Sequence, residues 1–177
     1  MSDDAAAQRL GHWQEAVLVL LRMGIGWHLL YEGLVKVLAP GWTSAPFLAE
    51  SRWLLSGVFH WIAAHPAALW VVDALNVWGL VLIGLALLLG AFSRFAAVSG
   101  VLLLALYYVG SPPLVGLPAS PAAEGSYLIV NKNLVEVAAL GVVFLTGSGL
   151  YAGLDRIIHG LLRRKRLASG EQRPATA

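Results

Sequence analysis

Charged side chains stand at the start of an apolar segment near the end of the chain, where apolar helices normally avoid charge. Lys132 and Glu136 are one helical turn apart, with Asn131 and Asn133 beside them. Such groups are costly in a membrane unless they face protein or a wet cavity. Brought together around a ligand, a carboxylate could exchange protons and an ammonium group could stabilise developing negative charge.

Three earlier apolar segments carry polar groups as well. They lie late in the first segment, early in the second and late in the third: Glu32 and Lys36, Asp73 and Asn76, and Tyr107 and Tyr108. If successive segments cross a membrane in opposite directions, all of these groups fall in the same half of the bilayer. The sequence therefore predicts a polar cavity near the extracytoplasmic surface, suited to a small polar or amphiphilic ligand.

The predicted site divides by chemical role. The carboxylates expected to exchange protons as catalytic groups are Glu32, Asp73 and Glu136. The residues expected to bind the ligand are Arg22, Lys36, Asn76, Trp78, Tyr107, Tyr108, Asn131, Lys132 and Asn133. Because the formal charges of the outer carboxylates and lysines nearly cancel, a paired network that only fixes helix register remains open.

The composition indicates the elements that must position these groups. Of 177 residues, 58% are hydrophobic and 12% charged, whereas about a quarter of a soluble domain is charged. Segments 14–38, 67–90, 92–110 and 132–152 approach the roughly 20 apolar residues that a spanning helix needs. The expected fold is all-α, an integral membrane four-helix bundle.

The connections complete this prediction. The long loop over 40–66 has apolar residues at helical spacing and three tryptophans, which predicts an amphipathic helix on the extracytoplasmic surface, a surface anchor or a lid. Residues 111–126 are rich in proline and glycine, so an ordered or semi-rigid loop is expected there. Around the membrane domain, 14–158, we expect a cytoplasmic tail over 1–13. A basic cytoplasmic tail over 159–177 is expected to be disordered at its end.

The placement of basic residues predicts the orientation. Most arginines lie near the N-terminus, in the turn after the second segment or in the C-terminal tail, and four helices bring these places to one side. The positive-inside rule then puts both termini in the cytoplasm. The run Arg163–Arg166 follows a membrane segment, so we assign it to orientation and anionic lipid and expect no nucleic-acid partner.

The first apolar segment has a predicted buried face. At about 100° per residue, one stripe holds small and charged residues together: Arg22, Gly26, Leu29, Gly33 and Lys36. Small residues on a stripe let a second helix approach closely. Arg22 lies about 12 Å from the end of its segment, at 1.5 Å per residue, and needs a buried partner or a bound anion.

Several kinds of chemistry find no support in the sequence. The chain has no cysteine, which excludes disulfides, thiolate metal sites and dithiol redox cycling. Its five histidines lack metal-ligand spacing, so no metal or haem is expected. His28 and Glu32 are four apart, but one imidazole and one carboxylate do not make a metal site.

Two motifs resemble the DoxX-like family of small four-helix membrane proteins. The first segment has an arginine, glycines and then Gly-x-x-Lys: Arg22, Gly26, Gly33 and Lys36. The fourth ends in Leu-Thr-Gly-x-Gly followed by an aspartate: Leu145, Thr146, Gly147, Gly149 and Asp155. The resemblance covers most of residues 14–158. Ser148 stands where the family usually has proline.

The resemblance implies a multi-pass protein of the bacterial inner membrane, linked to a thiosulfate:quinone oxidoreductase system. The first hypothesis is therefore a membrane subunit that binds quinone or quinol in the polar cavity, with an oxidoreductase partner subunit and a possible homo-oligomer. The second is a non-enzymatic scaffold or assembly partner. The third is a small-solute transporter, against which the lack of internal repeats argues.

Overall fold

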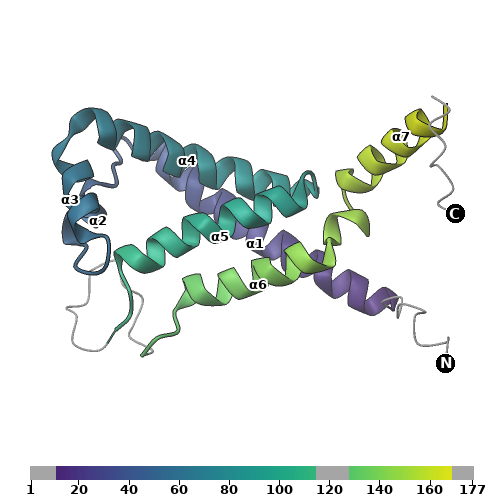
Figure 1. Ribbon diagram of the computed structural model, residues 1–177, viewed down its shortest axis with the longest axis horizontal. Coiled ribbons are helices and arrows are strands. Elements are labelled where there is room, and N and C mark those ends of the chain that lie inside the picture. Colours follow the sequence, from purple (N-terminus) through teal and green to yellow (C-terminus); the bar gives the residue numbers. More distant parts are fainter. Residues whose placement is uncertain (1–10, 115–127, 169–177) are drawn as a thin grey trace, which may run out of the picture.

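The computed structural model describes residues 11–114 and 128–168, and side chains as far as 161. Within these ranges every regular element is a helix (Figure 1). The elements are α1 (His12–Leu38), α2 (Ala45–Glu50), α3 (Ser56–Ala64), α4 (Pro66–Leu89), α5 (Ser93–Gly110), α6 (Lys132–Thr146), the 3₁₀ helix η1 (Ser148–Leu150) and α7 (Leu154–Ala168). The all-helical prediction is confirmed for these residues. Most of the proline-rich loop and the outer parts of both tails lie outside the described residues.

Three helices, α1, α4 and α5, are long and apolar enough to cross a membrane. Large apolar side chains on α4 face outward, with Trp70 72%, Leu75 68% and Leu82 61% exposed. Apolar surface of this kind marks a membrane or protein contact, so the chain is a membrane protein whose helices contact lipid. The fourth predicted span corresponds to α6, which has 15 residues and ends at Gly147 in the left-handed conformation. A four-span bundle therefore stays a prediction.

Close packing of α1 on α4 depends on glycine. A Cβ atom at Gly26 would lie 2.9 Å from the backbone nitrogen of Leu88, and one at Gly33 would lie 2.9 Å from that of Val81. A Cβ atom at Gly84 of α4 would likewise contact backbone atoms of Leu30 and Gly26 in α1. Such contacts let helix backbones approach closely in a membrane, where the hydrophobic effect contributes little to association of the helices. The predicted stripe is confirmed, because its arginine, leucine and both glycines are buried.

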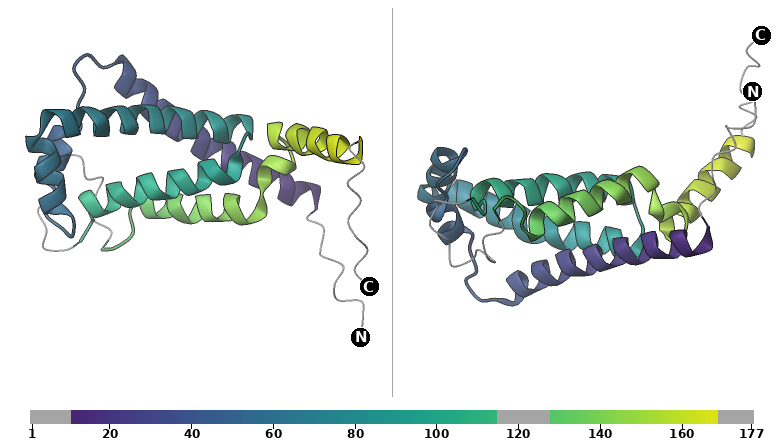
Figure 2. Two further views of the ribbon diagram at one scale, coloured as in Figure 1. Left: turned by 45° about the horizontal axis from the view of Figure 1, so that its top comes forward. Right: turned by 90° about the horizontal axis from the view of Figure 1, so that it is seen from below.

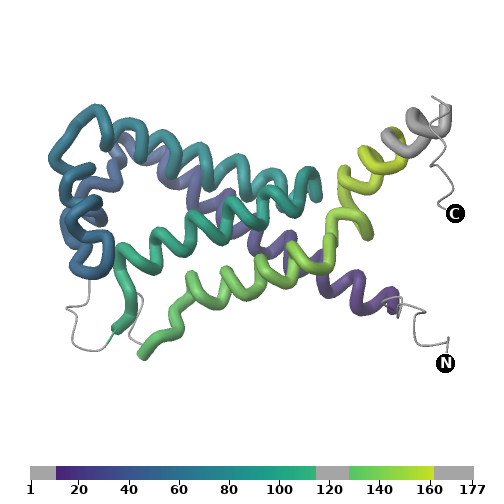
Figure 3. Tube along the Cα trace, viewed as in Figure 1, coloured from purple at the N-terminus to yellow at the C-terminus, as the bar shows by residue number. Residues whose placement is uncertain are grey.

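The helices form two main pairs, α1 with α4 and α5 with α6 (Figures 1 and 2). Both pairs contribute to one apolar core, in which Leu29, Leu80, Leu104 and Leu140 are at most 2% exposed. The helices α2 and α3 lie across one end of the molecule, and α7 leaves from the other, as the trace in Figure 3 also shows. We refer to these as the α2–α3 end and the α7 end.

The connection between α1 and α4 differs from the single amphipathic helix that the sequence predicts. It contains two short helices, separated by residues 51–55. Leu48 of α2 and Phe59 of α3 are buried, while Trp61 remains 56% exposed. Ser51 follows α2 in an extended conformation, which ends the helix. Two short helices can turn across the end of the bundle where one straight helix could not.

Candidate functional site

A cavity of about 470 Å³ lies near the α2–α3 end. We call it the polar cavity. Its walls combine ionisable, amide, hydroxyl, aromatic and leucine side chains. The lining residues are His28, Leu29, Glu32, Lys36, Trp42, Thr43, Ser44, Pro46, Phe47, Glu50, Asn76, Leu80, Leu104, Tyr107, Ser111, Pro113, Asn131, Lys132, Asn133 and Glu136.

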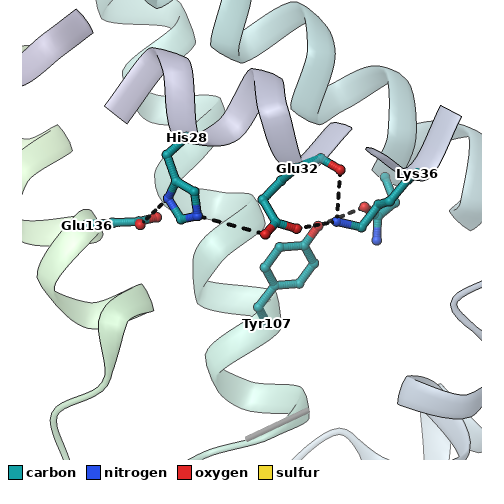
Figure 4. Close-up of polar contacts among 6 residues, drawn as sticks. His28, Glu32, Lys36, Tyr107 and Glu136 are labelled. Atoms are coloured by element: carbon teal, nitrogen blue, oxygen red, sulfur yellow. Dashed lines mark hydrogen bonds and ion pairs between the residues drawn. The ribbon is translucent and has the colours of Figure 1, made fainter. Parts of the chain in front are cut away.

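A row of charged and titratable groups runs along α1 and crosses to α6 (Figure 4). Lys36 Nζ lies 2.9 Å from Oε2 of Glu32, and the Nε2 atom of His28 lies 4.0 Å from Oε1 of the same glutamate. The other ring nitrogen of His28 lies 2.5 Å from Oε1 of Glu136. The imidazole thus stands between two carboxylates on different helices. This arrangement suits proton transfer, because an imidazole can accept a proton at one nitrogen and release it at the other.

Glu136 has unused hydrogen-bonding capacity. Its side chain is 16% exposed, and Oε2 is buried without a hydrogen-bond partner among the described residues. The start of α6 positions it, because the side chain of Asn131 accepts a hydrogen bond from the amide of Leu134 at 3.1 Å. An asparagine at this place fixes the first turn of a helix. The carboxylate therefore projects from an ordered turn and lines the polar cavity beside His28.

Another part of the lining is aromatic and apolar. The hydroxyl of Tyr107 donates a hydrogen bond to Asn76 Oδ1 at 2.7 Å, which joins α5 to α4. The Phe47 ring meets the Tyr107 ring edge-on, with centroids 6.1 Å apart. Trp42 also lines the cavity, with Lys36 Nζ 5.7 Å from its ring centroid. An aromatic ring with polar substituents could contact these rings and the polar row together.

The helix α2 is fastened beside the cavity by Asp73 of α4. One carboxylate oxygen of Asp73 accepts from the backbone amide of Ser44 at 2.8 Å and from its hydroxyl at 2.5 Å. Ser44 is only 4% exposed and directly precedes α2. These bonds occupy that oxygen, so Asp73 positions the cavity wall rather than lining it.

Eight of the predicted site residues come together at the polar cavity: Glu32, Lys36, Asn76, Tyr107, Asn131, Lys132, Asn133 and Glu136. Four do not line it. Arg22 is buried toward the α7 end, where Nη2 donates to the carbonyl of Ala152 at 2.6 Å. Trp78 is 57% exposed on the surface of α4.

The other two predicted residues lie near the cavity without lining it. Asp73 holds Ser44, as described above. Tyr108 donates to the carbonyl of Ile129 at 2.8 Å and meets the ring of Trp53. It follows Tyr107 directly, and neighbouring residues on a helix point about 100° apart. One of the two tyrosines therefore faces the cavity and the other faces the loop that precedes α6.

The lining residues that sequence reasoning did not predict include His28, Trp42 and Phe47. The spacing of His28 and Glu32 is visible in the sequence and was considered only as a metal site. The second carboxylate beside His28, that of Glu136, comes from a distant helix. No local pattern marks Trp42 or Phe47, because their position depends on how α2 folds back. In the described part of the chain, no three His, Asp or Glu side chains form a group that could hold a metal ion.

Comparisons with known proteins give no match, whether the chain is compared with family models, curated proteins or solved structures.

Proposed function

We propose that the chain is a DoxX-like inner-membrane protein that binds a quinone or quinol in the polar cavity. In this proposal α6 and η1 form the fourth span, both termini lie in the cytoplasm, and the cavity opens toward the extracytoplasmic side. The observation that carries the proposal is the polar cavity itself, whose lining combines a carboxylate–imidazole contact of 2.5 Å with aromatic rings.

The size and lining of the cavity support a small amphiphilic ligand. Its 470 Å³ falls within the range of about 300–1,000 Å³ typical of small-molecule sites. Leu29, Leu80 and Leu104 supply an apolar wall, while His28, Glu32 and Glu136 supply polar groups. A quinone head group offers a flat ring between two oxygens, and its isoprenoid tail would extend into lipid. The donors and rings present fit such a ligand.

The proposed roles follow from the contacts. When bound, a quinone would supply two-electron, two-proton redox chemistry, with electrons from an external donor such as thiosulfate or a partner subunit. Glu136 and His28 would exchange protons with a quinone oxygen. Glu32 connects this pair to Lys36 and hence to the outer end of α1. Lys36 and Lys132 would stabilise negative charge, and the rings of Phe47 and Tyr107 would pack against the ligand.

A scaffold function is the second candidate. Its support is that Asp73 and Asn76 already have partners within the protein, at Ser44 and Tyr107. Here the polar network would join the helices and bind no ligand, while an assembly partner would occupy the surface. Removing one partner from such a network costs stability, because the other group is left buried and unpaired.

The test is mass spectrometry of an organic extract from protein purified gently from its native membrane. We expect stoichiometric quinone with the wild type and at least a tenfold loss with Glu136→Gln, which is about 1.4 kcal/mol of binding. The matched control is Glu15→Gln, in the first turn of α1 and away from the cavity. Absence of quinone from the wild type, together with no binding of added decylubiquinone, would refute the proposal. Co-purification of a protein without quinone would favour the scaffold.

A further inference from the structure

The start of α7 is fastened to the turn between α4 and α5. Oδ1 of Asp155 accepts a hydrogen bond from the amide of Phe92 at 2.6 Å, and Oδ2 accepts one from the amide of Ser93 at 2.9 Å. The amide of Asp155 donates to the carbonyl of Gly90 at 2.8 Å. Three bonds thus join the first turn of α7 to one short turn.

These bonds determine the level at which α7 begins. Both α4 and α5 are long and apolar enough to cross a membrane, so the turn that joins them lies at a membrane surface. The first turn of α7 must lie at the same surface. From there the helix leaves the α7 end of the molecule, with its main contact to η1 (Figures 1 and 3).

The described half of α7 is amphipathic. Leu154, Ile157 and Leu161 recur at the spacing of one helix face and are 41%, 58% and 60% exposed. At about 100° per residue, Arg156 and His159 fall on the opposite side. The helix therefore presents, at the level of the membrane surface, an apolar face that no described residue covers.

The sequence of the second half adds positive charge. Residues 163–166 are Arg, Arg, Lys and Arg, and the helix runs on to Ala168. A helix with an apolar face and many basic residues typically lies in the plane of the lipid head groups. Each basic residue near an anionic membrane surface strengthens binding about fivefold.

We propose that α7 is an interfacial helix that binds anionic phospholipid head groups at the membrane surface where the α4–α5 turn lies. Its apolar face enters the boundary between head groups and acyl chains, and its basic residues contact lipid phosphates. Charge complementarity favours lipid over a second copy of α7, because two such basic helices would repel each other. This inference is independent of the quinone proposal, because α7 and the polar cavity lie at opposite ends of the molecule.

The test uses a single fluorescent label, which the cysteine-free sequence permits. Full-length protein carrying Ile157→Cys is labelled with an environment-sensitive dye and reconstituted into phosphatidylcholine vesicles, with or without about one quarter phosphatidylglycerol. Arg156→Cys is the matched control on the polar face. Both leaflets have one composition and iodide is supplied on both sides of the membrane, so the direction of insertion does not affect the result.

We expect the label at position 157 to shift to the blue and to resist aqueous iodide in anionic vesicles, while the label at 156 stays quenchable. Replacing residues 163–166 by glutamine, or raising the salt concentration, should reverse the shift. Equal iodide quenching at both positions in anionic vesicles would overturn the proposal. An efficient disulfide between two unlabelled Ile157→Cys chains would also overturn it, in favour of a second copy as the occupant.

Discussion

Replacing Gly26 by alanine tests the contact between α1 and α4 on which the site depends. The new Cβ would lie 2.9 Å from the Leu88 nitrogen, while about nine in ten real Cβ contacts are longer than 3.4 Å. The atom it meets is backbone, so no side-chain rotation can relieve the clash. The two helices must separate locally by about half an ångström or more. His28 lies two residues farther along α1, so its contact with Glu136 should lengthen too.

Gly24 supplies the control from which the magnitude follows. A Cβ at Gly24 would meet nothing within 4 Å. Both substitutions gain the same helix propensity, about 1 kcal/mol for alanine over glycine. Their difference therefore isolates the cost of overpacking, which is about 1–3 kcal/mol for an extra methyl group in a well-packed interior. We expect Gly26→Ala to be the less stable variant by that amount.

The assay is reversible unfolding in mixed micelles of dodecyl maltoside and sodium dodecyl sulfate, followed by circular dichroism and tyrosine–tryptophan fluorescence. Gly26→Ala should unfold at a lower fraction of the ionic detergent than Gly24→Ala. Equal midpoints for the two variants would refute the close α1–α4 contact. Loss of ligand retention in Gly26→Ala, with retention kept in Gly24→Ala, would connect this contact to the polar cavity.

Three other substitutions test separate contacts. Asp155→Ala removes both acceptors for the α4–α5 turn and should cost about 1–2 kcal/mol in the same unfolding assay, a typical loss for a capping side chain. Tyr107→Phe leaves the Asn76 oxygen without its donor and should cost about 1 kcal/mol, whereas no change would mean that water replaces the hydroxyl. Asp73→Ala frees Ser44, so hydrogen exchange should become faster in α2 but not in α4; protection unchanged in α2 would contradict the anchoring role.

Local spacing was sufficient to predict the long apolar helices and the buried face of α1. The stripe of Arg22, Gly26 and Gly33 follows from helical periodicity alone, and its burial confirms that reasoning. The convergence of polar groups from distant segments follows from alternating helix direction, which places Glu32 and Glu136 at the same end. Neither prediction required knowledge of a tertiary contact.

Tertiary contacts account for what the sequence could not predict. The break between α2 and α3 depends on packing of Leu48 and Phe59 against the bundle end, which no local pattern encodes. Trp78 and Tyr108 stand at the predicted membrane level, but their angular positions on their helices keep them out of the cavity. The position of a residue along the helix axis follows from its residue number. Whether its side chain points into the cavity depends on how the helix packs against its neighbours.

The polar cavity distinguishes a ligand-binding function from a purely structural one better than the ion pairs do. Contacts such as His28–Glu136, between α1 and α6, would join helices in either case. A network that served only to fix helix register gains by drawing its members together, because smaller separations strengthen its contacts. The groups around the polar cavity instead surround a space of about 470 Å³. That space, rather than the ion pairs, is the observation on which the proposed binding of a ligand rests.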